Sequence, residues 1–253
     1  FAEIATTIFA LHPLNIDNIV WVVGRGDLLL LFWGILTCFF FDLFHKKKKI
    51  LFLACSSLFF LFGIFSKETF LFIFPLLILY ERFRYRKTTS LYHLVNLGWI
   101  VLFFILKSVI LHIANVKIVY YPNALESLRA IIGTLGYYFR TVVFPIFYDM
   151  FLLVSRARRW PYLFFGLVAL GFIAFVFYLS KKDKKLLVPL GLFCFFLLGH
   201  IPLIFTSVYP YQIYSRYMMI PSLGFVWLVT LFLIHVKEKT RFFIVFVILL
   251  AFI

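Results

Sequence analysis

Long apolar runs, separated by short basic blocks, dominate this sequence. An α-helix needs roughly 20 apolar residues to cross the hydrocarbon core of a bilayer. The runs that approach this length lie at 27–44, 50–65, 70–80, 93–113, 161–180, 186–205 and 220–235, with shorter ones at 1–11 and 242–253. Because 64% of the 253 residues are hydrophobic, a soluble domain could not bury them. The sequence predicts an all-α, polytopic membrane helix bundle of about seven to nine transmembrane helices with interfacial helices on the outer face.

The basic residues are grouped in blocks at 46–49, 82–87, 181–185 and 237–241. Basic blocks between apolar runs are typical of membrane topology signals, so the formal charge of +15 does not predict a nucleic-acid partner. The positive-inside rule places these blocks in the cytoplasm. The outer face then receives 12–25, 66–69, 115–127 and 206–217, which carry nearly all of the unusual polar residues.

The stretch 128–154 mixes charged residues, Pro145 and aromatics. This pattern favours an interfacial or re-entrant element on the outer face, with two spans in a tight hairpin as the alternative. We expect one membrane domain over 1–253. The sequence begins and ends inside apolar runs, so we also expect it to be a fragment of a longer chain.

Ionisable residues at 12–27 form the first candidate site. His12, Asp17, Arg25 and Asp27 stand at a membrane boundary, where charges are costly and are usually functional or paired. Asp17 can cap the helix that follows, or it can face an aqueous cavity with Arg25 two turns further along. His12 has no second metal ligand three or four residues away, so no metal site is predicted there.

Two further outer segments carry charged side chains. The turn 66–69 places Lys67 beside Glu68, a pair that either lines a site or is solvated as part of a plain loop. Tyr217 is typical of an interface anchor, whereas Arg216 offers a planar, permanently charged donor to a phosphate. Arg129 and Arg140 are candidates for the same role.

Four segments, in order, resemble the transmembrane O-mannosyltransferases that carry C-terminal tetratricopeptide repeats, and their bacterial relatives. The first is FALHPLNIDNIVWVVGRGDLLLLFW, with His-Pro, an acidic residue and Arg-x-Asp before an apolar run. The others are SKETFLFIFPLLILYE, YYFRTVVFPIFYDMFL and YSRYMMIPSLGF, so the resemblance covers nearly the whole sequence. It departs at Asp17, where the family usually has Glu, and at Ser215, where Glu usually precedes Arg-Tyr.

The resemblance implies a multi-pass membrane glycosyltransferase of the GT-C type, in a bacterial inner membrane or the endoplasmic reticulum. Such an enzyme moves a sugar, most often mannose, from a polyprenyl- or dolichyl-phosphate donor to a protein hydroxyl or glycan acceptor on the outer face. It implies catalytic roles for Asp17 and Glu68. The implied substrate-binding residues are His12, Arg25, Asp27, Lys67, Arg129, Arg140, Arg216 and Tyr217. No cofactor follows from the residues, although a carboxylate could hold a divalent cation. The family's catalytic first loop would precede Phe1.

A transporter or flippase for a lipid-linked or anionic substrate is the alternative. Transporters tend to place ionisable residues near the midplane, in broken helices and repeated halves. This sequence has no internal repeat, its charges collect toward one face, and only Lys107 and His200 are predicted at membrane depth. A structural anchor for a soluble partner would leave Arg216 and the Lys-Glu turn without a role. We therefore expect the enzyme.

Overall fold

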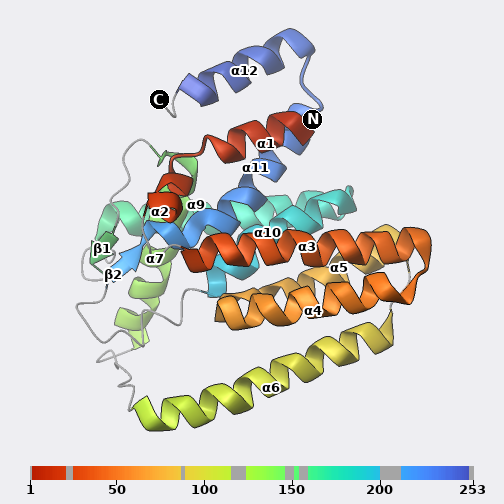
Figure 1. The fold of residues 1–253 in the computed structure, drawn as a ribbon. Coiled ribbons are helices and arrows are strands. Elements are labelled where there is room, and N and C mark those ends of the chain that lie inside the picture. Colours follow the sequence, from red (N-terminus) through yellow and green to blue (C-terminus); the bar gives the residue numbers. More distant parts are fainter. Residues whose placement is uncertain are drawn as a thin grey trace. The chain divides into compact units, whose positions relative to one another are not determined.

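The structure, a computed structural model, describes residues 2–20, 25–86, 89–114, 124–145, 151–153, 159–199 and 212–250. The chain divides into two compact units, unit 1 being Phe1–Val22 with Lys117–Ile253 and unit 2 being Val23–Val116. Helices make up almost all of both, which confirms the predicted helical bundle (Figure 1). One membrane domain over 1–253 stays a prediction, because helices of a single membrane domain can pack as more than one cluster.

Unit 2 packs α3 against α4, and α4 against α6, and these three helices run alongside one another in Figure 1. Its described elements are α3 (Arg25–Lys47), α4 (Ile50–Ser66), η2 (Glu68–Phe72), α5 (Ile73–Tyr85) and α6 (Ser90–Ala114). Pro75, in the predicted run 70–80, lies in the first turn of α5, directly after a 3-10 turn. Its missing N–H has no intrahelical partner to lose at this position.

Three helices in the described part of the chain are long and apolar enough to cross a membrane, namely Arg25–Lys47, Ser90–Ile110 and Trp160–Ser180. Ile50–Ser66 and Met219–Leu233 are shorter apolar helices. The figure of seven to nine spans stays a prediction. On α6, Leu94, Ile105 and Val109 are all more than half exposed, as expected for a helix whose solvent is lipid.

The face of α6 that packs on α4 is polar. Ser57 Oγ donates to Asn96 Oδ1 at 2.8 Å, and Trp99 Nε1 donates to Ser57 Oγ at 3.1 Å. Ser56 Oγ lies 2.7 Å from the hydroxyl of Tyr92. Interhelical hydrogen bonds of this kind hold helices together in lipid, where apolar side chains gain little by leaving the solvent.

Unit 1 collects the remaining elements around an aromatic core from α7, α10 and η6 that includes Tyr137, Tyr138, Phe193 and Met218. Its described elements are α1 (Ala2–Ala10), α2 (Leu14–Val20), α7 (Ala124–Val143), β1 (Phe151–Leu153), α9 (Trp160–Ser180), η4 (Lys184–Leu186), α10 (Leu187–Gly199), β2 (Gln212–Tyr214), η6 (Ser215–Met218), α11 (Met219–Leu233) and α12 (Glu238–Leu250). The predicted span 186–205 thus forms a helix as far as Gly199, and the rest lies outside the described residues.

Helices α7 and α9 pack against each other through two glycines. A Cβ atom at Gly136 would lie 1.8 Å from the carbonyl oxygen of Tyr162, and one at Gly166 would lie 2.2 Å from that of Ile132. Small residues at a helix crossing let the two backbones approach closely. A side chain at either glycine would therefore force α7 and α9 apart.

The stretch 128–154 ends in a strand. Strands β1 and β2 are antiparallel, with Phe151 opposite Tyr214 and Leu153 opposite Gln212. The alternative of two spans in a tight hairpin is therefore wrong, because the described part of this stretch holds only α7 and a strand. The predicted outer loop 115–127 lies mostly outside the described residues, and Ala124 already begins α7.

Candidate functional site

Asp27 and Lys67, forty residues apart in sequence, form an ion pair in unit 2. Asp27 lies in the first turn of α3, where a carboxylate is favoured by the helix dipole, and Lys67 follows the last turn of α4. Their side chains are 6% and 19% exposed. The pair joins two segments that the sequence predicted separately as parts of a site.

Glu68 forms a second ion pair with Lys107. Lys107 was predicted at membrane depth, and its pairing with Glu68 was missed. The length of the apolar run could have indicated this pair. Lys107 lies seventeen residues after Ser90, or about 26 Å along the axis of α6, so it is near the end of the helix that is far from Ser90. Both side chains are partly exposed, at 44% for Glu68 and 33% for Lys107.

These residues, together with the exposed Arg25, are named here the Lys-Glu group: Arg25, Asp27, Lys67, Glu68 and Lys107. Three are cationic and two are anionic, which leaves one positive charge in excess. Cations in such a group can stabilise a phosphate on which charge develops. Glu68 is the more exposed carboxylate, so it is better placed than Asp27 to accept a proton from a substrate.

His12 links the α1–α2 junction of unit 1 to α7. Its Nε2 lies 3.1 Å from the carbonyl oxygen of Val142, which can only accept, and its Nδ1 accepts from the N–H of Leu14 at 3.3 Å. These bonds select the neutral tautomer with a proton on Nε2. Burial lowers the pKa of His12 to about 4, although the bond to Val142 raises it. A substrate could engage this ring only by displacing one of the two bonds.

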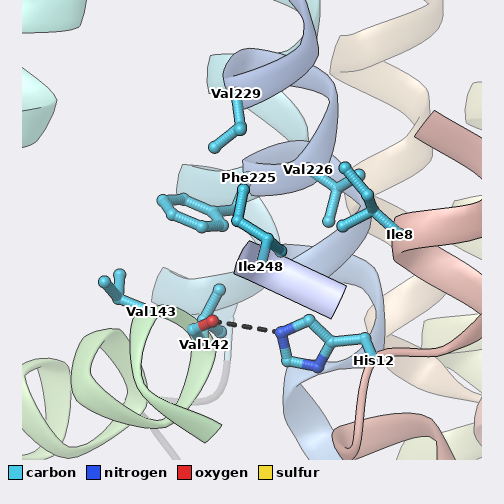
Figure 2. A pocket seen from close by; sticks show the side chains of 8 residues that line it. All are labelled: Ile8, His12, Val142, Val143, Phe225, Val226, Val229 and Ile248. Carbon is cyan, nitrogen blue, oxygen red and sulfur yellow. Dashed lines mark hydrogen bonds between the residues drawn. The ribbon is translucent and has the colours of Figure 1, made fainter. Parts of the chain in front are cut away.

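A cavity of about 150 Å³ lies beside the His12 ring (Figure 2). His12 is the only polar residue among those that line it, the others being Ile8, Val142, Val143, Phe225, Val226, Val229 and Ile248. An apolar cavity of this size can hold one small apolar molecule such as benzene. The cavity is too small and too apolar to receive a sugar.

Asp17 and Arg216 lie in neighbouring elements of unit 1. Asp17 is part of α2, which packs against η6, the turn that contains Arg216 and Tyr217. The side chains of Asp17 and Arg216 lie outside the described residues. Tyr217 is partly buried against the aromatic core. The structure thus brings together the two chain segments, which the sequence alone could not do.

Arg129 and Arg140 are separated along α7. Eleven residues correspond to about 16 Å of helix, too far for both to bind one phosphate. Arg129 lies 3.2 Å from Glu126 near the start of α7, whereas the Arg140 guanidinium lies 5.9 Å from the ring centre of Tyr162. Arg140 directly follows Tyr137, Tyr138 and Phe139, the residues of α7 that carry the aromatic part of the core.

Among the residues that the structure describes, no three His, Cys, Asp or Glu side chains are grouped so that they could hold a metal ion. No protein-family model matches the chain, and neither a curated protein nor a solved structure does so.

Proposed function

We propose that this chain is part of a multi-pass membrane glycosyltransferase, which moves a sugar from a polyprenyl-phosphate donor to a hydroxyl acceptor. The observation that carries the proposal is the Asp27–Lys67 ion pair. It joins the Arg-x-Asp and Lys-Glu segments, two of the four on which the resemblance to O-mannosyltransferases rests. With Glu68 and Lys107, these segments form one polar group at the end of apolar helices.

The charges of the Lys-Glu group suit a phosphate-bearing donor. Lys67, Lys107 and Arg25 supply the positive charge that a phosphate leaving group requires as the bond to the sugar breaks. Within unit 1, α2, which contains Asp17, packs against η6, which contains Arg216, and this is a second contact between an acidic and a basic segment. Mannose is the proposed sugar on the resemblance alone.

Glu68 is the proposed general base for the acceptor hydroxyl. It is almost half exposed, and its partner Lys107 is partly exposed as well, so a substrate can reach both. The Glu68 carboxylate can accept a proton once the donor phosphate competes for Lys107. Asp27, buried against Lys67, would position the turn.

The distribution of charge in unit 2 supports an enzyme over a transporter. Residues 28–41, 50–65, 69–80 and 94–106 contain no Asp, Glu, Lys or Arg. The charged groups therefore lie at the two ends of the helices, and fifteen residues of α3, or about 22 Å, separate Asp27 from Asp42. A transport path would need charged groups near the midplane.

Transfer of labelled mannose from a polyprenyl-phosphate donor, by the full-length protein in proteoliposomes, tests the proposal. We expect Glu68→Gln to lower kcat by about 100-fold or more with little change in KM, as for loss of a general base. Lys107→Met should raise KM for the donor. Glu238→Gln, an exposed position at the start of α12, is the matched control and should keep wild-type turnover.

Wild-type turnover in both Glu68→Gln and Lys107→Met would overturn the site. Movement of the labelled donor across the bilayer by the wild-type protein, without transfer of sugar, would instead establish the transporter.

A further inference from the structure

A second polar cluster lies at the other end of unit 2, around Glu81. One oxygen of this buried carboxylate accepts from the N–H of Thr89 at 2.9 Å and from its hydroxyl at 2.5 Å. The other oxygen lies 2.6 Å from Nε2 of His93, and Nε2 of His45 lies 3.1 Å from the first. A single carboxylate thus holds together the end of α3, the end of α5 and the start of α6.

Asp42 adds a second connection between α3 and α5. It accepts hydrogen bonds from the hydroxyls of Tyr80, at 3.0 Å, and Tyr85, and it pairs with Lys46 at 2.5 Å. The ring of Tyr85 stacks on that of His45 with centroids 4.0 Å apart. The chain segments that follow α3 and α5 are therefore neighbours, although almost forty residues separate them in sequence.

These contacts gather two basic blocks into one surface, named here the basic end of unit 2. It consists of the exposed residues Lys46, Lys47, Lys48, Lys49, Arg82, Arg84 and Arg86. Lys48 and Arg86 have φ angles of 56° and 53°, so the backbone turns sharply where α3 and α5 end. The nearby carboxylates do not balance the charge, because Glu81 is fully buried and Asp42 is occupied by Lys46.

Apolar side chains adjoin the basic end. Ile50, Leu51 and Leu91 are each at least 65% exposed at the helix starts that follow the basic residues. The ammonium of Lys47 lies over the ring of Phe52, 5.7 Å from the ring centre, so a cation of the basic end directly adjoins an apolar side chain. A layer of cations above a belt of apolar side chains matches the headgroup and acyl regions of a lipid leaflet.

We propose that the basic end of unit 2 binds the anionic phospholipid headgroups of the leaflet it faces. Clustered Lys and Arg at the end of a membrane helix attract phosphate-bearing lipids, and Arg can contact a phosphate with two donors at once. The adjoining apolar belt favours a lipid over a free anion or a nucleic acid, since those would leave the belt exposed. The inference requires only that the helices of unit 2 cross a bilayer and is independent of sugar transfer.

The turn between α9 and α10 in unit 1 offers a matched control. It also carries four exposed lysines, Lys181, Lys182, Lys184 and Lys185, but on a single turn. Its carboxylate, Asp183, accepts from the N–H of Lys185 at 3.0 Å and is exposed among them. If charge alone mattered, removing four lysines here would have the same effect as removing four basic residues from the basic end.

Spin-labelled phosphatidylglycerol and phosphatidylcholine, added to the full chain in phosphatidylcholine nanodiscs, test the proposal. The test variant combines Lys47→Gln, Lys49→Gln, Arg82→Gln and Arg84→Gln. It leaves unchanged the ion pair of Lys46 with Asp42 and the two residues with positive φ, Lys48 and Arg86. The control combines Lys181→Gln, Lys182→Gln, Lys184→Gln and Lys185→Gln. We expect the test variant to lower the preference for phosphatidylglycerol by about tenfold or more, because it lacks four basic groups and each one near an anionic surface contributes several-fold. The control should keep most of it, and helix content by circular dichroism should be unchanged in both.

Equal losses in the two variants, or no loss in the test variant, would overturn the proposal. Displacement of the labelled phosphatidylglycerol by millimolar inorganic phosphate would assign the surface to free anions, and displacement by a short RNA would assign it to nucleic acid. Either result would also overturn it.

Discussion

The ammonium group of Lys67 forms an ion pair with the carboxylate of Asp27, and both side chains are largely withdrawn from solvent. Each charge depends on the other, because an isolated buried charge is far more costly than a paired one. The pair therefore fixes the Lys-Glu turn against the start of α3, and with it the position of Glu68.

Lys67→Met leaves Asp27 buried without this partner. We expect the free energy of unfolding, measured in micelles, to fall by about 3–5 kcal/mol. The double variant Asp27→Asn with Lys67→Met should lose less than the single one, because no buried charge remains. Additive losses in the double-mutant cycle would show that the two residues do not interact.

Gly136→Ala would place a methyl carbon only 1.8 Å from the carbonyl oxygen of Tyr162, which is a severe clash. We expect a loss of stability of about 3 kcal/mol or more, since the two helix backbones must separate. Gly171→Ala, on an exposed face of α9, is the control, because nothing lies within 4 Å of its added Cβ. That variant should be neutral or slightly stabilised, by up to about 1 kcal/mol. Unfolding of both variants by denaturant in micelles measures the difference.

His12 should make stability depend on pH. Its pKa in the folded protein is about 4, lowered by burial from 6.5, so only the unfolded chain binds a proton between these values. The free energy of unfolding is therefore highest above pH 6.5 and falls with decreasing pH, by about 3 kcal/mol across the window. His12→Gln should flatten this dependence, whereas the exposed His235→Gln should preserve it. An unchanged slope in His12→Gln would contradict the assignment.

Glu81→Gln should weaken the cluster that holds α3, α5 and α6 together. Burial raises the pKa of Glu81, but hydrogen bonds from Thr89 and His93 outweigh it and hold the pKa below its usual 4.5. Its contribution to stability is thus present above pH 4.5 and is lost as the pH falls below that value. We expect Glu81→Gln to cost about 1.5–3 kcal/mol at neutral pH, the value of a hydrogen bond to a charged group. Glu238→Gln should cost almost nothing, and equal losses in the two variants would argue against the cluster.

Much of the helical arrangement follows from the sequence because long apolar runs have few other solutions in lipid. The predicted run 27–44 corresponds to α3, 161–180 to α9, and 220–235 to α11. Helix ends were less predictable. The run 93–113 gave no sign that α6 begins at Ser90, because the carboxylate that engages Thr89 comes from Glu81 on another helix.

The sequence allowed the residues of the candidate site to be predicted, but not the ion pairs that they form. Residue types at a membrane boundary singled out Asp27, Lys67 and Glu68, yet their partners depend on how α3, α4 and α6 pack. His12 shows the limit of such reasoning, since the carbonyl that fixes its tautomer is 130 residues away on α7. The cluster at Glu81 was missed because an acidic residue directly before the basic block 82–87 suggests only a local balance of charge.

The short ladder between β1 and β2 closes a loop in the chain. It pairs the segment before α9 with the segment before α11, so the chain that leaves β1 returns to it at β2. If α9 crosses a bilayer, as its length and composition allow, the chain must cross that bilayer an even number of times between the two strands. We therefore expect α9 and α10 to enter a membrane together, as a helical hairpin.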